Sequence, residues 1–186
     1  DFCLSRGLGD VYKRQDEVDR WEVDVGEEGD PIELAEARGS TFGRNAKFYF
    51  SSSPTIKGAS RISDLFESSD QRHYYVPCPT CGHHQVLEWE RLLYSPDFSV
   101  AHYQCAGPEC DVLIEEHHKG WMLANGEWRA HADGDGETVG FYLNALYAPS
   151  GWTDWRTLAR QYEKARKAQA AGNLEPMQVF LSLIHI

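Results

Sequence analysis

Four cysteines in two close pairs constrain the fold more than any other feature of this chain. Cys78 and Cys81 enclose two residues, Cys105 and Cys110 enclose four, and 23 residues separate the pairs. A tight turn with two thiolates can bind one metal ion, and two such turns complete a tetrahedral sulfur site that selects Zn²⁺. The pattern therefore predicts a structural zinc site.

Other uses of these residues stay open. CxxC is also a redox motif, and four thiols can form two disulfides. A redox motif should open a helix, whereas residues 85–89 indicate a strand, and a chain without a secretory signal favours metal ligation. Nearby histidines could replace a cysteine as ligand, although surface positions are the ordinary expectation for them: His83, His84, His117 and His118.

The cysteines lie among short alternating segments, which predict a small β module over residues 73–116. Its apolar residues are few: Val86, Leu87, Trp89, Leu92, Leu93 and Tyr103. Such a core is too small to be stable alone, so zinc should supply much of its folding free energy. We expect chelation to unfold residues 73–116 and to spare a helix predicted over 154–170.

Asp16 and Glu17 form an acidic pair ahead of this module. A P-loop ATPase needs two neighbouring acids at the end of a core strand. The first holds the Mg²⁺ that bridges the phosphates, and the second orients and deprotonates the attacking water. A solvated acidic loop is the alternative, because Asp-Glu pairs are common.

An aromatic strand predicted over residues 47–51 ends in small hydroxyl residues: Ser52, Ser53 and, after Pro54, Thr55. A hydroxyl at such a strand end can sense the γ-phosphate, although a plain Ser-Pro turn gives the same pattern. A helix predicted over 31–38, started by Asp30 and Pro31, separates the acids from this strand. Strand, helix and strand in this order predict a parallel pair whose ends share one edge.

Apolar spacing predicts further helices over 60–68, 154–170 and 175–180, with a polar turn over 131–138 and a strand over 140–147. The net charge of −11 suits no simple DNA-binding surface, but its distribution is uneven. Residues 16–37 hold ten acids and one base, whereas residues 38–72 hold six bases and three acids. We expect phosphate contact in this second stretch, at Lys57 and Arg61, and an ordinary solvated surface is the alternative.

The two ends, residues 1–15 and 181–186, resemble translated adapter sequence, and we leave them out of the fold prediction. No run of 18 apolar residues occurs, so no membrane span is predicted.

In combination, these motifs resemble the GpA-like family of phage terminase large subunits. The resemblance rests on six runs: DEVD, EGDPIELAEAR, SSSPTIKGASRI, SSDQRHYYVPCPTCGHHQVLEWERL, EEHHKGWMLANGEWRA and GFYLNALYAPSGWTDWRTLARQY. It implies an α/β fold, namely a partial P-loop NTPase with a parallel sheet, an inserted β zinc ribbon and C-terminal helices. The domains that the resemblance implies are the C-terminal part of an ATPase core over 16–72, a zinc ribbon over 73–116, and the end of the ATPase domain with linker helices over 117–180.

Carried over residue by residue, Asp16 and Glu17 match the family's Walker B acids. Residues 52–55 match its coupling motif, in which Ser53 replaces the usual threonine but keeps the hydroxyl. Cys78, Cys81, Cys105 and Cys110 match the family's cysteine pairs, and the second spacer is longer than the usual two residues.

The resemblance also implies cofactors and partners. These are ATP with Mg²⁺, structural Zn²⁺, double-stranded DNA, the terminase small subunit, the portal or procapsid, and further copies of the motor subunit. It implies that the protein acts in the host cytoplasm without contacting a membrane, and that the parent protein carries an endonuclease elsewhere in its sequence. The Walker A loop would precede Asp16 and most nuclease acids would follow residue 180, so the chain by itself should neither hydrolyse ATP nor cut DNA.

Two other functions remain open. The chain could be a zinc-ribbon module that binds nucleic acid or a partner protein. It could also belong to a superfamily 2 helicase, since DExD is a helicase-type motif, although a zinc ribbon at this place argues against that. A GxxxxGK[ST] loop in the upstream reading frame would favour the ATPase.

Overall fold

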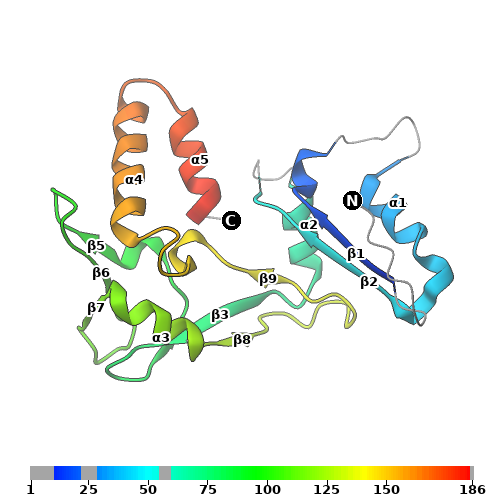
Figure 1. Ribbon diagram of the computed structural model, residues 1–186, viewed down its shortest axis with the longest axis horizontal. Helices are drawn as coiled ribbons and strands as arrows, with labels where there is room; N and C mark the ends of the chain where they lie inside the picture. The colour runs from blue at the N-terminus through cyan, green and yellow to red at the C-terminus, as the bar shows by residue number, and fades with distance from the viewer. Residues whose placement is uncertain (1–10, 22–28, 55–59, 185–186) are drawn as a thin grey trace. The chain divides into compact units, whose positions relative to one another are not determined.

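The computed structural model describes residues 11–21, 29–54 and 60–184 (Figure 1). The chain forms two compact units, residues 1–64 and 65–186. One helix, α2 (Arg61–Ser68), begins in the first unit and ends in the second. The fold is mixed α/β with small parallel and antiparallel sheets, as the sequence predicts.

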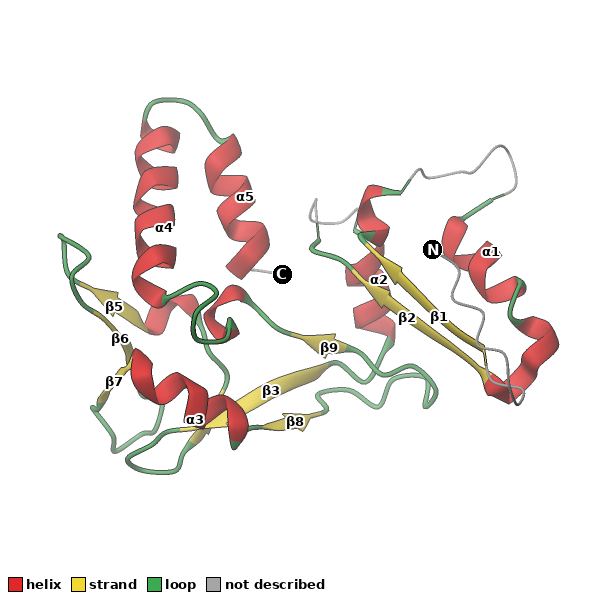
Figure 2. Cartoon of the chain, viewed as in Figure 1, coloured by secondary structure: helices red, strands yellow, loops and turns green. Residues whose placement is uncertain are grey.

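The first unit contains two parallel strands (Figures 1 and 2). Its described elements are β1 (Val11–Asp16), the 3₁₀ turn η1 (Val18–Arg20), α1 (Pro31–Ala37), the 3₁₀ segment η2 (Ser40–Asn45) and β2 (Ala46–Ser51). In the register of the pair, Asp16 lies opposite Ser51. The predicted parallel pairing is therefore confirmed, and the acidic and serine-bearing ends lie at the same edge.

Helix α1 begins where the sequence indicates. The Asp30 carboxylate accepts a hydrogen bond of 2.7 Å from the backbone N–H of Ile32, and Pro31 occupies the first turn. Capping of this kind satisfies an N–H group that has no partner inside the helix. Ile32 and Ala35 are buried, so one face of the short helix packs into its unit.

Strand β1 falls largely within the residues that we left out of the fold prediction. Its six residues pair with β2 along the whole strand. Pairing of this kind uses backbone N–H and C=O groups, which every residue except proline supplies, so the side-chain pattern of residues 11–15 did not indicate the strand. The origin of residues 1–15 stays a prediction.

The second unit combines two small sheets with helices. One sheet has the order β4-β3-β8, with β9 parallel to β3, and the other has the antiparallel order β5-β6-β7. Its elements after α2 are β3 (Arg72–Pro77), β4 (His84–Gln85), η3 (Trp89–Arg91), β5 (Leu92–Tyr94), β6 (Ala101–Gln104), β7 (Leu113–Glu115), η4 (Glu116–His118), α3 (Lys119–Ala124), β8 (Glu127–Arg129), β9 (Phe141–Tyr142), η5 (Ala145–Tyr147), α4 (Trp155–Ala170) and α5 (Glu175–Ile184).

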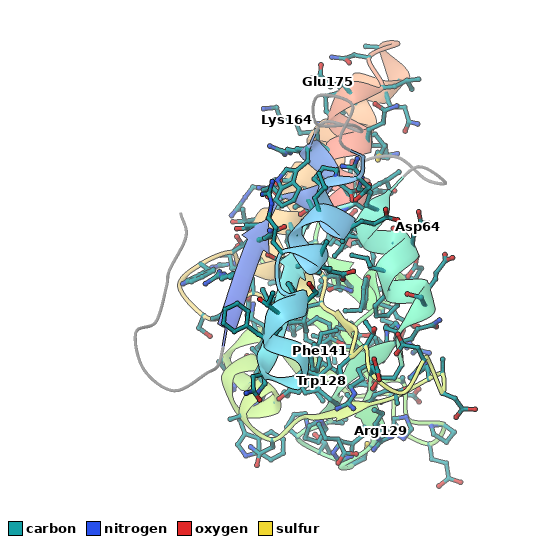
Figure 3. All side chains as sticks on the ribbon, turned by 90° about the vertical axis from the view of Figure 1, so that its right-hand side faces the viewer. Asp64, Trp128, Arg129, Phe141, Lys164 and Glu175 are labelled. Carbon is teal, nitrogen blue, oxygen red and sulfur yellow. The ribbon has the colours of Figure 1, made fainter. Side chains whose placement is uncertain are left out.

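Aromatic rings link the strands of the first of these sheets. The rings of Tyr74 on β3 and Trp128 on β8 lie 4.8 Å apart, and Trp128 meets Phe141 of β9 edge-on at 4.8 Å (Figure 3). Such contacts stabilise a short-stranded sheet that has few backbone hydrogen bonds.

The cysteine segment shares one core with the C-terminal helices. The Tyr103 ring lies 6.0 Å from that of Trp155 in α4, and Trp89 meets Phe180 of α5 at 4.8 Å. Leu93, which we assigned to a separate small core, is 44% exposed. The apolar residues of the β segments pack against α4 and α5 as well as against each other, so the described residues of this segment share a larger core than their own side chains supply.

Two predicted strands are shorter in the structure. Of the strand predicted over 85–89, only Gln85 pairs, as the last residue of β4. Of the strand predicted over 140–147, only Phe141–Tyr142 pairs. The backbone N–H of Leu87 instead donates to the Tyr147 hydroxyl at 2.7 Å, and its carbonyl accepts from the Asn144 side chain at 2.7 Å. Side chains from distant positions thus take the hydrogen bonds that a strand partner would have supplied.

Helices α4 and α5 lie side by side (Figure 2). The Asp154 carboxylate caps α4 by accepting from the backbone N–H of Thr157 at 2.6 Å, and Gly172 follows the helix with a φ of 89°. Helix α5 continues past residue 180 to Ile184, which is buried. No helix in the described ranges has both the length and the apolar character needed to cross a membrane.

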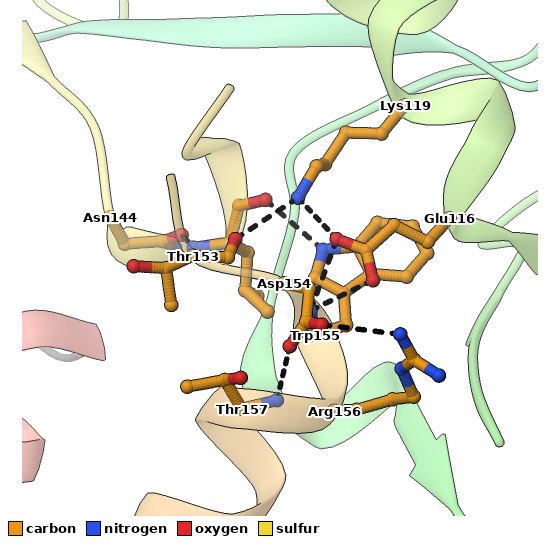
Figure 4. Close-up of polar contacts among 9 residues, drawn as sticks. Glu116, Lys119, Asn144, Thr153, Asp154, Trp155, Arg156 and Thr157 are labelled. Atoms are coloured by element: carbon orange, nitrogen blue, oxygen red, sulfur yellow. Dashed lines mark hydrogen bonds and ion pairs between the residues drawn. The ribbon is translucent and has the colours of Figure 1, made fainter. Parts of the chain in front are cut away.

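A buried lysine joins α3 to the start of α4 (Figure 4). Lys119 is 0% exposed, and its ammonium donates to Glu116 at 2.6 Å and to the Thr153 carbonyl at 3.4 Å. Both oxygens of Glu116 also accept from the backbone N–H of Trp155, at 3.1 and 2.9 Å. The ammonium lies 5.3 Å from the centre of the Trp155 ring, which adds a cation–π contact.

We expect Glu116→Ala to destabilise the chain by about 3 kcal/mol, because it leaves a buried ammonium without its counter-ion. Chemical denaturation of the purified chain measures the free energy of unfolding. Glu115→Ala is the matched control, since that neighbouring side chain is 63% exposed and pairs with His117 at the surface. If Glu116→Ala and Glu115→Ala lowered the free energy of unfolding equally, the buried Glu116–Lys119 pair would have no special role in stability.

Candidate nucleotide site and metal centre

The acidic pair lies at the end of β1. Asp16 is the last residue of the strand, and Glu17 follows with a φ of 57°, in the left-handed region. Both residues are exposed. A residue other than glycine in this conformation costs free energy, and such residues are concentrated at functional sites.

Ser51 fixes the Asp16 carboxylate. Its hydroxyl donates to Asp16 Oδ1 at 2.6 Å, and the backbone N–H of Glu17 donates to the same oxygen at 3.0 Å. These two hydrogen bonds, that from Ser51 first, hold the pKa of Asp16 below its ordinary value of 3.8. The carboxylate is therefore ionised at neutral pH and suits a divalent cation.

Our sequence prediction did not include Ser51. The signal was available, because the serine run begins at residue 51 and a parallel register of β1 and β2 places that residue beside Asp16. We assigned the run to the coupling motif from Ser52 onward and did not consider the last residue of the strand itself.

Ser52 and Ser53 lie directly after β2. Ser52 Oγ accepts from the backbone N–H of Asp19 at 3.2 Å and lies 3.3 Å from the Ser53 carbonyl, to which it donates. The tip of β2 is thus bound to the turn after the acidic pair. Thr55 and Lys57 lie outside the described residues, and their roles stay predictions.

Arg61 and Arg20 both have acidic partners. Arg61 pairs with Asp30 at 3.1 Å, and its guanidinium also donates to the carbonyls of Val18 and Trp21. Arg20 pairs with Glu17 at 3.0 Å. The structure thus holds Arg61 against its own unit, and its contact with DNA stays a prediction.

The four cysteines converge on one point. Their sulfur atoms all lie within 4.8 Å of one another, and the distance from Cys81 to Cys105 is 3.7 Å. A tetrahedral zinc with 2.3 Å bonds would hold its sulfurs roughly 3.8 Å apart. All four cysteines are free thiols, and within the described ranges none of the four candidate histidines belongs to this cluster.

Backbone hydrogen bonds close the first turn. Gly82, with a φ of 71°, donates its N–H to the Cys78 carbonyl at 2.9 Å, and the Cys78 N–H donates to His83 at 2.9 Å. The glycine takes this left-handed conformation without steric cost, which lets Cys78 and Cys81 face the same point.

The longer second spacer also closes. The Cys110 N–H donates to the Gly107 carbonyl at 3.0 Å, and the Gly107 N–H donates to Cys105 Sγ at 3.3 Å. A Cβ atom on Gly107 would lie 3.3 Å from the Cβ atoms of both Cys110 and His83. A glycine at this point therefore permits the two turns to approach, and the four-residue spacer does not prevent convergence.

The electrostatics of the cluster also suit a metal ion. A backbone hydrogen bond from His83 lowers the pKa of the Cys81 thiol to about 7, so thiolate is readily available. Burial raises the pKa of Cys105, which disfavours its charge unless a cation is bound. Four sulfur donors at this spacing could hold Zn²⁺, and a site of four thiolates would leave no open coordination position.

Comparison with known proteins decides the family. Residues 12–128 match the family model "Phage terminase large subunit gpA, ATPase domain". The chain belongs to this family. It is also similar to the terminase large subunit of Enterobacteria phage P21, at 27% identity over 199 residues. The alignment covers 89% of the chain and 30% of the relative, so the chain spans about a third of that protein, and no solved structure matches it.

The part of the chain that matches the gpA ATPase domain includes both sites. It contains β1 and β2 with the acidic pair, and it contains all four cysteines. Helices α4 and α5 lie beyond the match, although their side chains complete the core beneath the cysteines. The cysteine cluster is thus embedded in a terminase ATPase segment.

Proposed function

We propose that this chain is part of the ATP-driven motor that moves viral DNA into a procapsid. The observation that carries the proposal is the shared edge of β1 and β2, where the Asp16–Glu17 pair meets the serine run. Membership of the gpA ATPase family supports a terminase rather than a helicase.

Each residue at this edge has a distinct role in the proposed reaction. The ionised Asp16 carboxylate would hold Mg²⁺, which neutralises phosphate charge when it is bound. Ser51 keeps that carboxylate in one orientation. Glu17 would orient the attacking water and accept its proton. Ser52 and Ser53, at the tip of β2, would respond to the γ-phosphate.

The complete activity belongs to a longer protein. The alignment covers 30% of the phage P21 terminase large subunit, and in this proposal a GxxxxGK[ST] loop in the longer protein would cradle the phosphates. Double-stranded DNA, the terminase small subunit, the portal or procapsid, and further copies of the same subunit are the partners proposed from the family. From the same family we also propose that the parent protein carries an endonuclease and that it acts in the host cytoplasm.

The cysteine cluster has a structural role in this proposal. Zn²⁺ held by Cys78, Cys81, Cys105 and Cys110 would tie the β segments to the core that α4 and α5 complete. A second candidate function, a ribbon that binds nucleic acid directly, has no specific support among the described residues.

The full-length terminase that contains this chain tests the proposal. Purified with its small subunit, it should hydrolyse ATP faster when linear double-stranded DNA is present, and it should package that DNA into procapsids. A full-length reading frame without a phosphate-cradling loop upstream of Asp16, or a protein without DNA-dependent ATPase, would refute it.

Asp16→Asn should weaken binding of Mg²⁺-nucleotide by on the order of tenfold or more, because the neutral amide loses the charge that attracts the cation. Fluorescent ATP analogue titrations with and without Mg²⁺ measure this. Glu36→Gln, a change of the same chemistry on the exposed side of α1, is the control. Equal Mg²⁺ dependence in the Asn variant and the wild type would show that Asp16 does not hold the metal.

A further inference from the structure

Asp19 connects two parts of the first unit. It follows the acidic pair in η1 and is half-buried. Its backbone N–H donates to Ser52 Oγ at 3.2 Å, and its carboxylate accepts from the backbone N–H of Ile62 at 2.8 Å. One residue therefore contacts both the serine-bearing tip of β2 and the first turn of α2.

The contact with α2 is more than an ordinary helix cap. Ser60 already caps the helix locally, because its hydroxyl accepts from the backbone N–H of Ser63 at 3.2 Å. The carboxylate of Asp19 is added from 43 positions away in the chain. A negative charge at a helix N-terminus is favourable, so this contact ties the helix to the β1 end.

Arg61 provides a second connection at the same place. As the first residue of α2, it donates to the carbonyls of Val18 and Trp21, on either side of Asp19. Its ion pair with Asp30 adds the start of α1. The beginning of α2 is therefore fixed to the turn that carries the acidic pair.

The other end of α2 is fixed in the second unit. After the helix, Asp70 Oδ1 accepts from the backbone N–H of Gly140 at 3.1 Å, and its carbonyl accepts from His131 at 3.1 Å. The ring of Phe66 lies 5.8 Å from that of His73 on β3. The last turn of α2 therefore packs on β3 within the second unit.

We propose that Asp19 is the positioning residue that transmits a change at Ser52 to the first turn of α2. The proposal rests on the proposed function and deepens it, since it says how a response to the γ-phosphate leaves the nucleotide edge. Asp19 itself does not contact the reacting atoms. It acts through two hydrogen bonds, one from its own backbone and one to its carboxylate.

The full-length terminase with its small subunit, linear double-stranded DNA and ATP provides the test. Asp19→Ala should reduce the DNA packaged per ATP by roughly tenfold, the effect of one lost charged hydrogen bond. Its kcat and KM for ATP without DNA should stay within about twofold of the wild type. Asp19→Asn keeps an oxygen that can accept from Ile62 and should recover most of the coupling.

Two further variants make the result specific. Glu67→Ala, at an exposed acid on the same helix, should couple normally. Ser52→Ala breaks the same connection at its other end, so the double variant with Asp19→Ala should lose no more coupling than the more affected single variant. Additive losses would overturn the proposal.

Other outcomes would also overturn it. Normal coupling in Asp19→Ala, loss of its ATP turnover without DNA, or failure of Asp19→Asn to recover coupling would each do so. If Asp19→Ala does not fold, the coupling measured in the Ser52→Ala and Asp19→Asn variants still tests whether Asp19 connects Ser52 to α2. A wild-type protein without DNA-dependent ATPase would instead refute the proposed function, so the two failures are distinguishable.

Discussion

Glu17→Gln in the full-length terminase should abolish ATP turnover and leave nucleotide binding nearly unchanged. The amide has the shape of the carboxylate but cannot accept a proton from water, and loss of a general base costs on the order of 10²- to 10⁴-fold in rate. Asp16 and its hydrogen bond with Ser51 stay intact in this variant, so the proposed metal position is preserved.

Pre-steady-state and steady-state ATPase assays, together with nucleotide titrations, separate the two effects. Glu33→Gln, at an exposed position of α1, is the matched control and should be as active as the wild type. An unchanged hydrolysis rate in Glu17→Gln would show that another residue is the base. A loss of binding equal to the loss of rate would show that Glu17 holds the nucleotide instead.

Removal of zinc should unfold the second unit. Structural zinc sites contribute about 10–16 kcal/mol in zinc-finger peptides, which matches or exceeds the total stability of a typical domain. From the sequence we expected α4 to survive chelation. The structure changes that expectation, because Trp155 and Leu158 of α4 are buried in the same core as Tyr103 and Cys105.

Elemental analysis should therefore find one zinc per chain, and a chelator should abolish the near-ultraviolet signal of the buried aromatic residues while helical content falls. Cys105→Ser should have the same effect. Cys3→Ser is the control, since Cys3 stands outside the two cysteine pairs of the sequence. A purified full-length protein with no zinc, or a chelated chain with unchanged stability, would contradict the site.

Several features follow from local sequence. The helix starts at Asp30 and Asp154 were predictable, because a capping side chain acts on N–H groups two or three residues away. The parallel direction of β1 and β2 was predictable from the helix expected between them. The two cysteine pairs specified a four-sulfur cluster, since each turn fixes its own pair and only their meeting depends on the rest of the chain.

Other features required the tertiary structure. The hydrogen bonds of Asp16 with Ser51 and of Asp19 with Ile62 join residues 35 and 43 positions apart. Which hydroxyl meets which carboxylate depends on strand register and helix placement, and no short-range pattern encodes either.

Packing decided the rest. The amino-acid sequence did not predict that Lys119 is buried against Trp155. It also did not predict that the strand after Gly140 is short, or that the cysteine segment and α4 share one core. Sequence by itself determined the chemistry available here: paired acids, a serine run and four thiols. The tertiary structure determined which of these groups meet, because burial and hydrogen-bond satisfaction are properties of the whole packed unit rather than of any segment.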